Sequence, residues 1–290
     1  MQLPTHLIIV CCHAIYLGPD SSVESNWLIE PFQRGETDTY IAHIEAGVRQ
    51  LSKDENALLV FSGGATKKDR TDKSEGEAYL NVAIERNLFG LETTPPSLHQ
   101  RMFVDRFATD SYQNVLCSLV QFPLLVAEYQ RRKVQTEDGT NPAAEADVNE
   151  DVVFPSKLTI VSHEFKRSRF LDLHLPAMRW GRETHYVGIN PPFDAVKMAE
   201  IKVGDRLRGY GAWEKDLYGV GEVLSRKRKG RGWDGEVFRR EVLLRLPEDV
   251  REELERVVFY QGGQDLTALY DGRVPWDILA FFDSYTMSLN

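Results

Sequence analysis

The stretch Ala57–Tyr79, ALLVFSGGATKKDRTDKSEGEAY, decides the expected fold of this chain. It begins with five apolar residues, a run typical of a strand buried on both faces of a parallel sheet. Ser62-Gly63-Gly64 follows, where the missing side chains allow a sharp turn or a close approach of a ligand to backbone amides. Ser74 and Glu77 then form a capping box, which predicts the first turn of a helix. The stretch is therefore half of a βαβ unit, and its loop lies where open α/β sheets bind ligands.

Strands and helices alternate along the first two thirds of the chain. The spacing of apolar residues between the strands favours helices. Strands are expected at Leu7–Cys12, Ala57–Phe61, Arg101–Asp105, Lys157–Val161 and His185–Ile189. Five strands that alternate with helices indicate an α/β fold with a doubly wound, mainly parallel sheet.

The helices carry more specific expectations. Asp38 or Thr39 is expected to cap the first helix, and Asp110 to cap a long helix after the third strand. Pro123 lies inside that long helix and is expected to bend or interrupt it, because proline has no amide hydrogen to donate. The segment Glu164–Trp180 is expected to form a single helix.

After the fifth strand the alternation stops. Helices are expected at Trp213–Arg228 and Pro247–Val258, without further strands. We therefore predict an α/β domain at residues 1–200 and, at residues 201–290, a helical extension packed on it. Residues 136–151 contain six acidic residues and no basic one, which indicates a mobile surface insertion in the first domain.

Charge and cysteine content limit the environment and the partners. The 290 residues carry a formal net charge of −9, so the surface is expected to repel nucleic acid and anionic membranes. The three cysteines include no C-x-x-C pair, which argues against a disulfide framework and a zinc site. The apolar segment Leu7–Leu17 has no preceding basic residue, so a buried strand is favoured over a signal peptide. We expect a cytoplasmic protein and leave its oligomeric state open.

The carboxyl ends of the first four strands should meet at one edge of the sheet. That edge would bring together Cys12-His13, Ser62-Gly63-Gly64, Asp105–Asn114 and Ser162–Arg169. The glycine amides could hold a phosphate or carboxylate, although an ordinary tight turn has the same sequence. Neither a Walker A loop nor a G-x-G-x-x-G motif is present.

Several side chains at this edge have alternative interpretations. Lys166, Arg167 and Arg169 could hold an anion at the start of a helix, or could pair with the protein's own carboxylates. His13 and His163 could act as general acid or base, or could be structural. Cys11 or Cys12 is a weaker candidate nucleophile, because buried strand cysteines are usually inert.

The basic run at residues 226–231 could touch nucleic acid or act as a targeting patch. The acidic balance of the rest of the chain and the lack of interleaved aromatic residues favour another interpretation. We expect the run to be a solvated helix end or a partner in internal salt bridges.

Four motifs follow one another along the chain: the strand before Ser62-Gly63-Gly64, then Ser74-Glu75, Asp105-x-x-Ala108-Thr-Asp-Ser111-x-x-Asn114, and Val161-Ser162 before Lys166-x-x-Arg169. In this order they resemble the domain of unknown function 218 family, which includes the bacterial SanA, YdcF and ElyC proteins. The likeness covers roughly residues 7–193, and the chain looks like the eukaryotic, largely fungal branch.

The resemblance implies a Rossmann-like α/β sandwich with its site at the carboxyl edge. It places these residues in the site: Ser62, Gly63, Gly64, Glu75, Ser111, Asn114, Ser162 and Arg169. Bacterial members often carry a histidine where this chain has Lys166, so that role would fall here to His163 or His13. Some members are suspected of binding S-adenosylmethionine or another nucleotide-like ligand.

We therefore expect a protein that binds a small anionic, phosphorylated or nucleotide-like ligand, with hydrolysis or transfer at phosphate as the reaction class to test first. The candidate catalytic residues are His13, Glu75 and His163. The candidate ligand-binding residues are Ser62, Gly63, Gly64, Ser111, Asn114, Ser162, Lys166 and Arg169. No metal site is expected, and the cofactor stays open between a nucleotide and S-adenosylmethionine.

Two alternatives come from other functional classes. One is a transferase that uses S-adenosylmethionine, which ranks lower because no acidic residue clearly ends the second strand to bind a ribose. The other is a non-enzymatic interaction protein that uses the C-terminal extension and its basic run.

Overall fold

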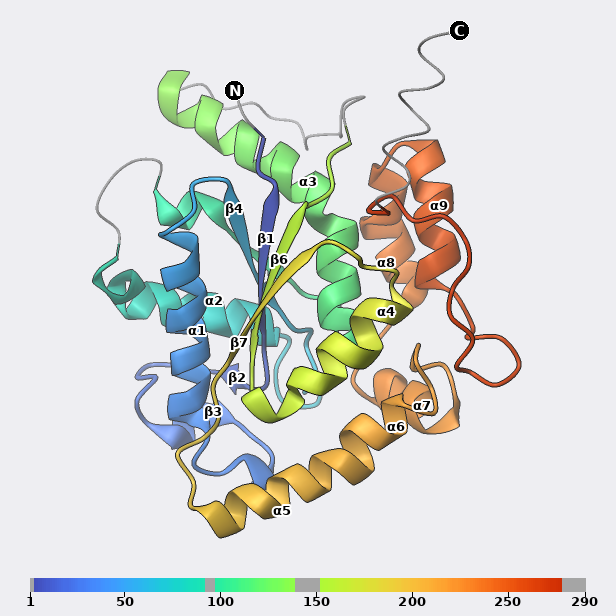
Figure 1. Cartoon of the computed structure of the whole chain (residues 1–290). Coiled ribbons are helices and arrows are strands. Elements are labelled where there is room, and N and C mark those ends of the chain that lie inside the picture. Colours follow the sequence, from blue (N-terminus) through green and yellow to red (C-terminus); the bar gives the residue numbers. More distant parts are fainter. Residues whose placement is uncertain (1–2, 92–96, 139–151, 278–290) are drawn as a thin grey trace, which may run out of the picture.

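The computed structural model describes residues 3–91, 97–138 and 152–277, and its centre is a five-stranded sheet. The strand order is β5-β4-β1-β6-β7, and every neighbouring pair is parallel (Figure 1). The strands are β1 (His6–Cys11), β4 (Ala57–Ser62), β5 (Met102–Asp105), β6 (Lys157–Ser162) and β7 (Glu183–Gly188). The predicted α/β fold with a doubly wound parallel sheet is confirmed.

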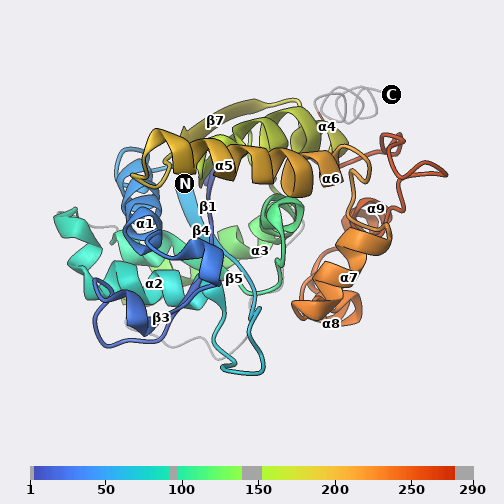
Figure 2. The same ribbon diagram turned by 90° about the horizontal axis from the view of Figure 1, so that it is seen from below.

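Helices cover both faces of this sheet. Helices α1 (Thr37–Leu51) and α2 (Glu75–Glu85) lie on one face, and the long helix α3 (Ser111–Asp138) lies on the other (Figure 2). Alternate residues of β1 enter the two cores, Leu7 and Ile9 on the α3 face and Ile8 and Val10 on the α1 face. All four are fully buried, which explains why the strand is apolar throughout.

A two-stranded antiparallel hairpin follows β1 and was not predicted. It pairs β2 (Ile15–Tyr16) with β3 (Trp27–Leu28). The Trp27 indole is buried, and its N–H donates to the carbonyl of Ser21 at 2.9 Å. The pattern hides this pair because two residues are too few to show a periodicity of two.

Two of the three predicted helix caps are present in the structure, and one is not. Ser74 caps α2 in a capping box with Glu77, as predicted. Asp110 accepts the amide hydrogen of Gln113 at 2.9 Å at the start of α3. The expected cap of α1 by Asp38 or Thr39 is wrong, because α1 already begins at Thr37, after Glu36.

One expectation about helix continuity is also wrong. Helix α3 runs through Pro123, so of the two predicted effects of this proline an interruption does not occur. The segment expected to be one helix divides into a 3₁₀ turn at Glu164–Lys166, a π-helical turn at Arg169–His174 and the short α4 (Leu175–Ala177). Pro176 lies within α4 and cannot donate the amide hydrogen that a regular helix would require of it.

The C-terminal third consists of helices among the described residues, which end at residue 277. They are α5 (Ala195–Asp205), a π-helical turn (Arg206–Tyr210), α6 (Gly211–Trp213), α7 (Glu222–Gly230), α8 (Gly235–Glu241) and α9 (Glu248–Val258). The expected helix over Trp213–Arg228 is wrong, because the chain turns at Gly219, whose φ is +66°. Asp216 stabilises that turn by accepting the amide hydrogens of Val220 and Gly221.

These C-terminal helices share a core with the sheet. Trp213, Leu224 and Leu254 belong to the same buried cluster as Val115 and Leu119 of α3. Helix α5 runs across the predicted domain boundary at residue 200. Most of the acidic segment 136–151 lies outside the described residues, and residues 136–138 are the last of α3. None of the helices in the described ranges is both long and apolar enough to cross a membrane.

Candidate functional site

A cavity of about 980 Å³ opens at the carboxyl edge of the sheet. Its lining comes from the chain after β1, the residue before α1, the loop before α3, the segment after β6 and the helices α5 to α7. Helix α5 lies below the carboxyl ends of the strands and closes this side of the molecule (Figure 1). The strand-end loops therefore meet where the sequence predicted, and the C-terminal helices supply the opposite wall.

Basic side chains outnumber acidic ones in the cavity wall. Seven are basic: Arg34, Lys166, Arg169, Lys197, Arg208, Lys227 and Arg231. Five are acidic: Glu36, Glu75, Asp110, Glu200 and Asp205. The chain as a whole carries −9, so this local excess of positive charge runs against the average surface. Low-dielectric walls lined by one sign of charge concentrate ions of the opposite sign.

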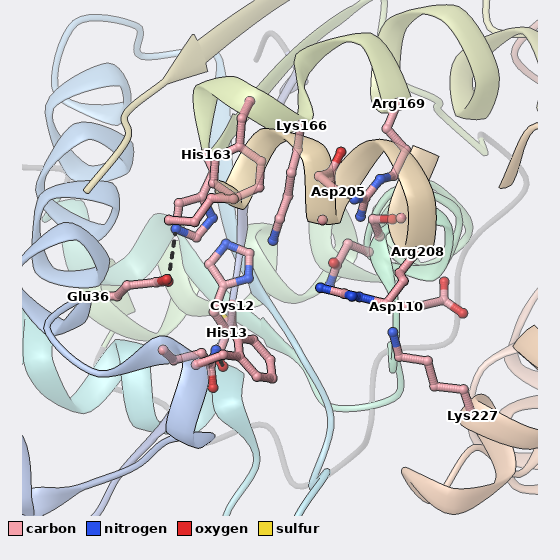
Figure 3. A pocket seen from close by; sticks show the side chains of 18 of the residues that line it. Cys12, His13, Glu36, Asp110, His163, Lys166, Arg169, Asp205, Arg208 and Lys227 are labelled. Carbon is pink, nitrogen blue, oxygen red and sulfur yellow. Dashed lines mark hydrogen bonds and ion pairs between the residues drawn. The ribbon is translucent and has the colours of Figure 1, made fainter. Parts of the chain in front are cut away.

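Lys166 is a cation of the cavity wall without an ion-pair partner among the described residues. Its half-buried side chain points into the cavity between His163 and Arg169 (Figure 3). Its Nζ lies 5.7 Å from the ring centroid of Phe165, and it forms no hydrogen bond or ion pair with any residue in the described ranges. Burial, with a contribution from Arg169, lowers the pKa of Lys166 to about 7. An anion nearby would favour the charged ammonium.

Arg169 also enters the cavity but is already paired. Its guanidinium forms a nearly buried ion pair with Asp205 of α5, while its Nε has no hydrogen-bond partner in the described chain. Burial lowers the pKa of Arg169 to about 10. Gly209 lies against this guanidinium, and a Cβ there would displace the end of the Arg169 side chain.

Arg167 does not join the other two cations of its predicted cluster. Both of its terminal contacts go to the carboxylate of Glu164, at 2.7 Å each, and its guanidinium lies over the ring of Tyr186. It is absent from the cavity wall. The structure therefore brings Lys166 and Arg169 together and turns Arg167 away.

Three histidines gather at the inner end of the cavity. The ring of His163 lies 4.5 Å from that of His13 and 4.9 Å from that of His43. Burial lowers the pKa of all three rings well below the ordinary value of 6.5, so they are neutral at pH 7. The amide hydrogen of His13 is donated to Tyr79 Oη at 3.2 Å, and Gln33 donates to the His13 carbonyl at 2.9 Å.

Glu36 completes this histidine group, and the sequence analysis missed both Glu36 and His43. Glu36 Oε2 lies 3.4 Å from His163 Nε2, a contact that lacks the alignment of a hydrogen bond. The same oxygen accepts the hydroxyl hydrogen of Tyr40 at 2.9 Å. His43 could have been found from its spacing, because it follows Tyr40 by three residues and so shares the buried face of α1. Within the described ranges, no cluster of histidine, cysteine and acidic residues has the arrangement of a metal centre.

The glycine turn does not offer its amides to a ligand, so that prediction is wrong. The amide hydrogen of Gly63 is donated to the carbonyl of Asp105 at 3.0 Å, and that of Gly64 to the carbonyl of Ala108 at 2.6 Å. The turn closes onto the end of β5 and the loop that follows it. A Cβ on Gly63 would lie 2.8 Å from the Cβ atoms of both Cys12 and Glu75, so close packing requires glycine here.

Ser62 and Asn114 hold the strand ends together. The hydroxyl of Ser62 donates to Asp105 Oδ2 at 2.7 Å, and the amide of Asn114 donates to the Ser62 carbonyl at 2.8 Å. Ser162 is fully buried, with its Oγ 3.4 Å from His13 Nε2. Neither serine lines the cavity, whereas Asn114 does. These residues position the cavity wall and leave ligand contacts to others.

Glu75 and Ser111 both reach the cavity but have partners. Glu75 accepts the hydroxyl hydrogen of Thr66 at 2.6 Å, and burial raises the pKa of its carboxyl. Ser111 Oγ lies 2.8 Å from Nε2 of the buried His174. Each keeps a fixed orientation at the cavity wall.

The basic run at residues 226–231 forms part of the cavity, which the sequence analysis did not predict. Lys227 of α7 and Arg231, the residue that follows this helix, both line the wall and are four residues apart. Arg231 also donates to the carbonyl of Thr109 at 2.8 Å. Arg228, on another face, forms a nearly buried ion pair with Asp110 at 2.5 Å. The spacing of Lys227 and Arg231 was the available signal.

The cysteines are poor nucleophiles in this environment. Burial raises the pKa of the Cys11 thiol to about 12, and burial together with Glu75 raises that of Cys12. Cys12 reaches the cavity wall, but its sulfur contacts the carbonyl of Val10 at 3.6 Å. Both stay in the thiol form at neutral pH.

The fold and the cavity define an α/β protein with a doubly wound parallel sheet and a cation-lined cavity at the carboxyl edge. The chain is 25% identical, over 235 residues, to the "Uncharacterized protein YOR238W" of Saccharomyces cerevisiae; the match covers 66% of this chain and 69% of the yeast protein. No protein-family profile matches the chain. No solved structure matches it either.

Proposed function

We propose that the cavity binds a small anionic ligand, phosphorylated or nucleotide-like. The observation that carries this proposal is Lys166, a half-buried cation directed into the cavity with no carboxylate partner in the described chain. Burying a charge is costly unless a counter-charge compensates it. A ligand phosphate would supply that charge, and Arg208 and Lys227 extend toward the same space (Figure 3).

Hydrolysis or transfer at phosphate is the reaction class that we propose for this site. Lys166, Arg208 and Lys227 would stabilise negative charge on the phosphoryl oxygens. His163 and His13, which are neutral, could accept a proton from the attacking hydroxyl or water. Glu36, 3.4 Å from His163, would orient the ring and stabilise its cation as it forms. This assignment keeps His13, His163 and Glu75 as the candidate catalytic residues and adds Glu36 as a positioning residue.

The test is ligand-induced stabilisation of matched variants. Thermal unfolding and calorimetry would be measured with inorganic phosphate, pyrophosphate and ATP. Lys166→Met removes the charge and keeps the length of the side chain, so it should abolish both the rise in Tm and the binding heat. Arg167→Met changes charge equally one residue away but outside the cavity, so it should leave both intact.

Two results would count against the proposal. One is a wild-type protein that none of the three anions stabilises. The other is an equal loss of stabilisation in Lys166→Met and Arg167→Met, since that would reflect the overall charge and not the cavity.

The alternatives receive less support from the cavity. S-adenosylmethionine carries a sulfonium cation, which the excess of basic over acidic side chains in the cavity wall disfavours. Binding heat with this cofactor would support that alternative. A role for the basic run in partner capture competes with its place in the cavity wall. We also propose that the chain belongs to the domain of unknown function 218 family and that the protein is cytoplasmic.

A further inference from the structure

The inner end of the cavity holds a buried side chain whose hydrogen-bonding groups are unused. His163 is 2% exposed, lines the cavity, and forms no hydrogen bond through either ring nitrogen with the described residues. Its ring is held by stacking on Phe165, with centroids 4.9 Å apart and planes at 30°. Buried polar groups without a partner cost free energy, and a bound ligand is one way to satisfy them.

The neighbours of His163 determine which ligand group fits there. A neutral imidazole has one donor and one acceptor nitrogen. The ring of His13, 4.5 Å away, adds its Nδ1, since its Nε2 already lies 3.4 Å from Ser162 Oγ, and the Glu36 carboxylate at 3.4 Å adds an acceptor. A hydroxyl group both donates and accepts, so it matches this set. A phosphate dianion only accepts, and it would face the Glu36 carboxylate.

Two of the cations lie farther from His163 and Glu36 than Lys166 does (Figure 3). Arg208 and Lys227 extend from the helical wall, on the far side of Lys166 from His163 and Glu36 (Figure 3). The cavity therefore has a cationic end and a hydrogen-bonding end. Its volume of about 980 Å³ is at the upper limit of typical small-molecule sites and far exceeds what one phosphate needs.

We propose that the ligand is a phosphate ester of a hydroxylated sugar ring, whose hydroxyl groups bind at His163, His13 and Glu36. This inference rests on the proposed function and adds the class of ligand to it. A free sugar phosphate and the ribose phosphate of a nucleotide share this chemistry.

A ligand series on the wild-type protein tests the proposal without any mutation. Calorimetry would compare ribose 5-phosphate, AMP, inorganic phosphate and tetrahydrofurfuryl phosphate, which has the furanose ring and the phosphate but none of the ring hydroxyls. We expect ribose 5-phosphate or AMP to bind at least about tenfold more tightly than the analogue without hydroxyls, because that analogue leaves the buried groups unpaired. Tighter binding of AMP would identify a nucleotide as the source, and tighter binding of ribose 5-phosphate a free sugar phosphate.

Two variants then assign the effect to the inner end. His163→Phe keeps a stacked ring without nitrogens, and should remove the preference for ribose 5-phosphate over tetrahydrofurfuryl phosphate while leaving the affinity for inorganic phosphate within about twofold. Glu36→Gln should reduce the same preference if His163→Phe fails to fold. Equal affinity of the wild-type protein for the two esters would overturn this inference and leave the proposed function standing. Binding of none of the four compounds would instead overturn the proposed function.

Discussion

Replacing Asp205 with Asn should weaken the fold and strengthen anion binding at the same time. Asp205 on α5 pairs with Arg169, and the two side chains are only 11% and 10% exposed. The substitution keeps the shape of the side chain and removes its charge. Arg169 would then lack a counter-charge at the cavity wall.

The two effects have separate magnitudes. Removing one partner of a buried ion pair typically costs about 3–5 kcal/mol, and we expect the lower value because an asparagine oxygen can still accept a hydrogen bond from Arg169. A charge-assisted hydrogen bond from the freed guanidinium to a bound anion contributes about 1.5–3 kcal/mol. The affinity for an anion should therefore rise by about tenfold or more.

Urea unfolding would measure the stability, and calorimetry with inorganic phosphate would measure the affinity. Asp277→Asn is the control, since Asp277 pairs with Arg179 outside the cavity at 2.5 Å. It should cost some stability and leave the affinity unchanged. If Asp205→Asn loses stability without gaining affinity, Arg169 is a structural residue and takes no part in binding the anion.

Two further predictions concern charge. The affinity for sulfate should fall as the pH rises from 6 to 8, because Lys166 has a pKa of about 7 and binds the anion in its protonated form, while sulfate stays a dianion. Lys166→Arg should flatten this pH dependence in calorimetric titrations. A steep fall of the affinity in that variant would contradict the role given to Lys166. Arg228→Ala should cost about 3 kcal/mol in urea unfolding because it leaves the nearly buried Asp110 unpaired. Arg226→Ala removes an exposed pair with Glu222 and should change stability by less than about 1 kcal/mol, so equal losses in the two variants would refute this reasoning.

The sheet could be predicted from the sequence because its signal is local. The central strands β1 and β4 are short apolar runs that are buried throughout, and such a run is favoured where helices cover both faces. The capping box at Ser74 is local in the same way, since both of its hydrogen bonds lie within four residues. The convergence of His13 and His163 then followed from the topology of a parallel sheet.

The glycine turn shows why the rest could not be predicted. Free and satisfied amides have the same sequence, and the difference depends on which carbonyls lie opposite. Those carbonyls belong to Asp105 and Ala108, more than forty residues away. Helix α5 was missed for another reason. Its apolar residues Ala199, Ile201 and Val203 alternate with polar ones, a spacing that does not match a helix.

The cavity joins two parts of the chain that the sequence analysis treated separately. Lys197, Arg208, Lys227 and Arg231 all come from the C-terminal helices, whereas the histidines come from the sheet side. Two nearly buried ion pairs, Arg169 with Asp205 and Arg228 with Asp110, tie the two sides together across this cavity. An anion that binds Arg169 at the nitrogen contacting Asp205 must compete with that carboxylate. Anion binding and the attachment of α5 are therefore thermodynamically linked, and what stabilises one weakens the other at Arg169.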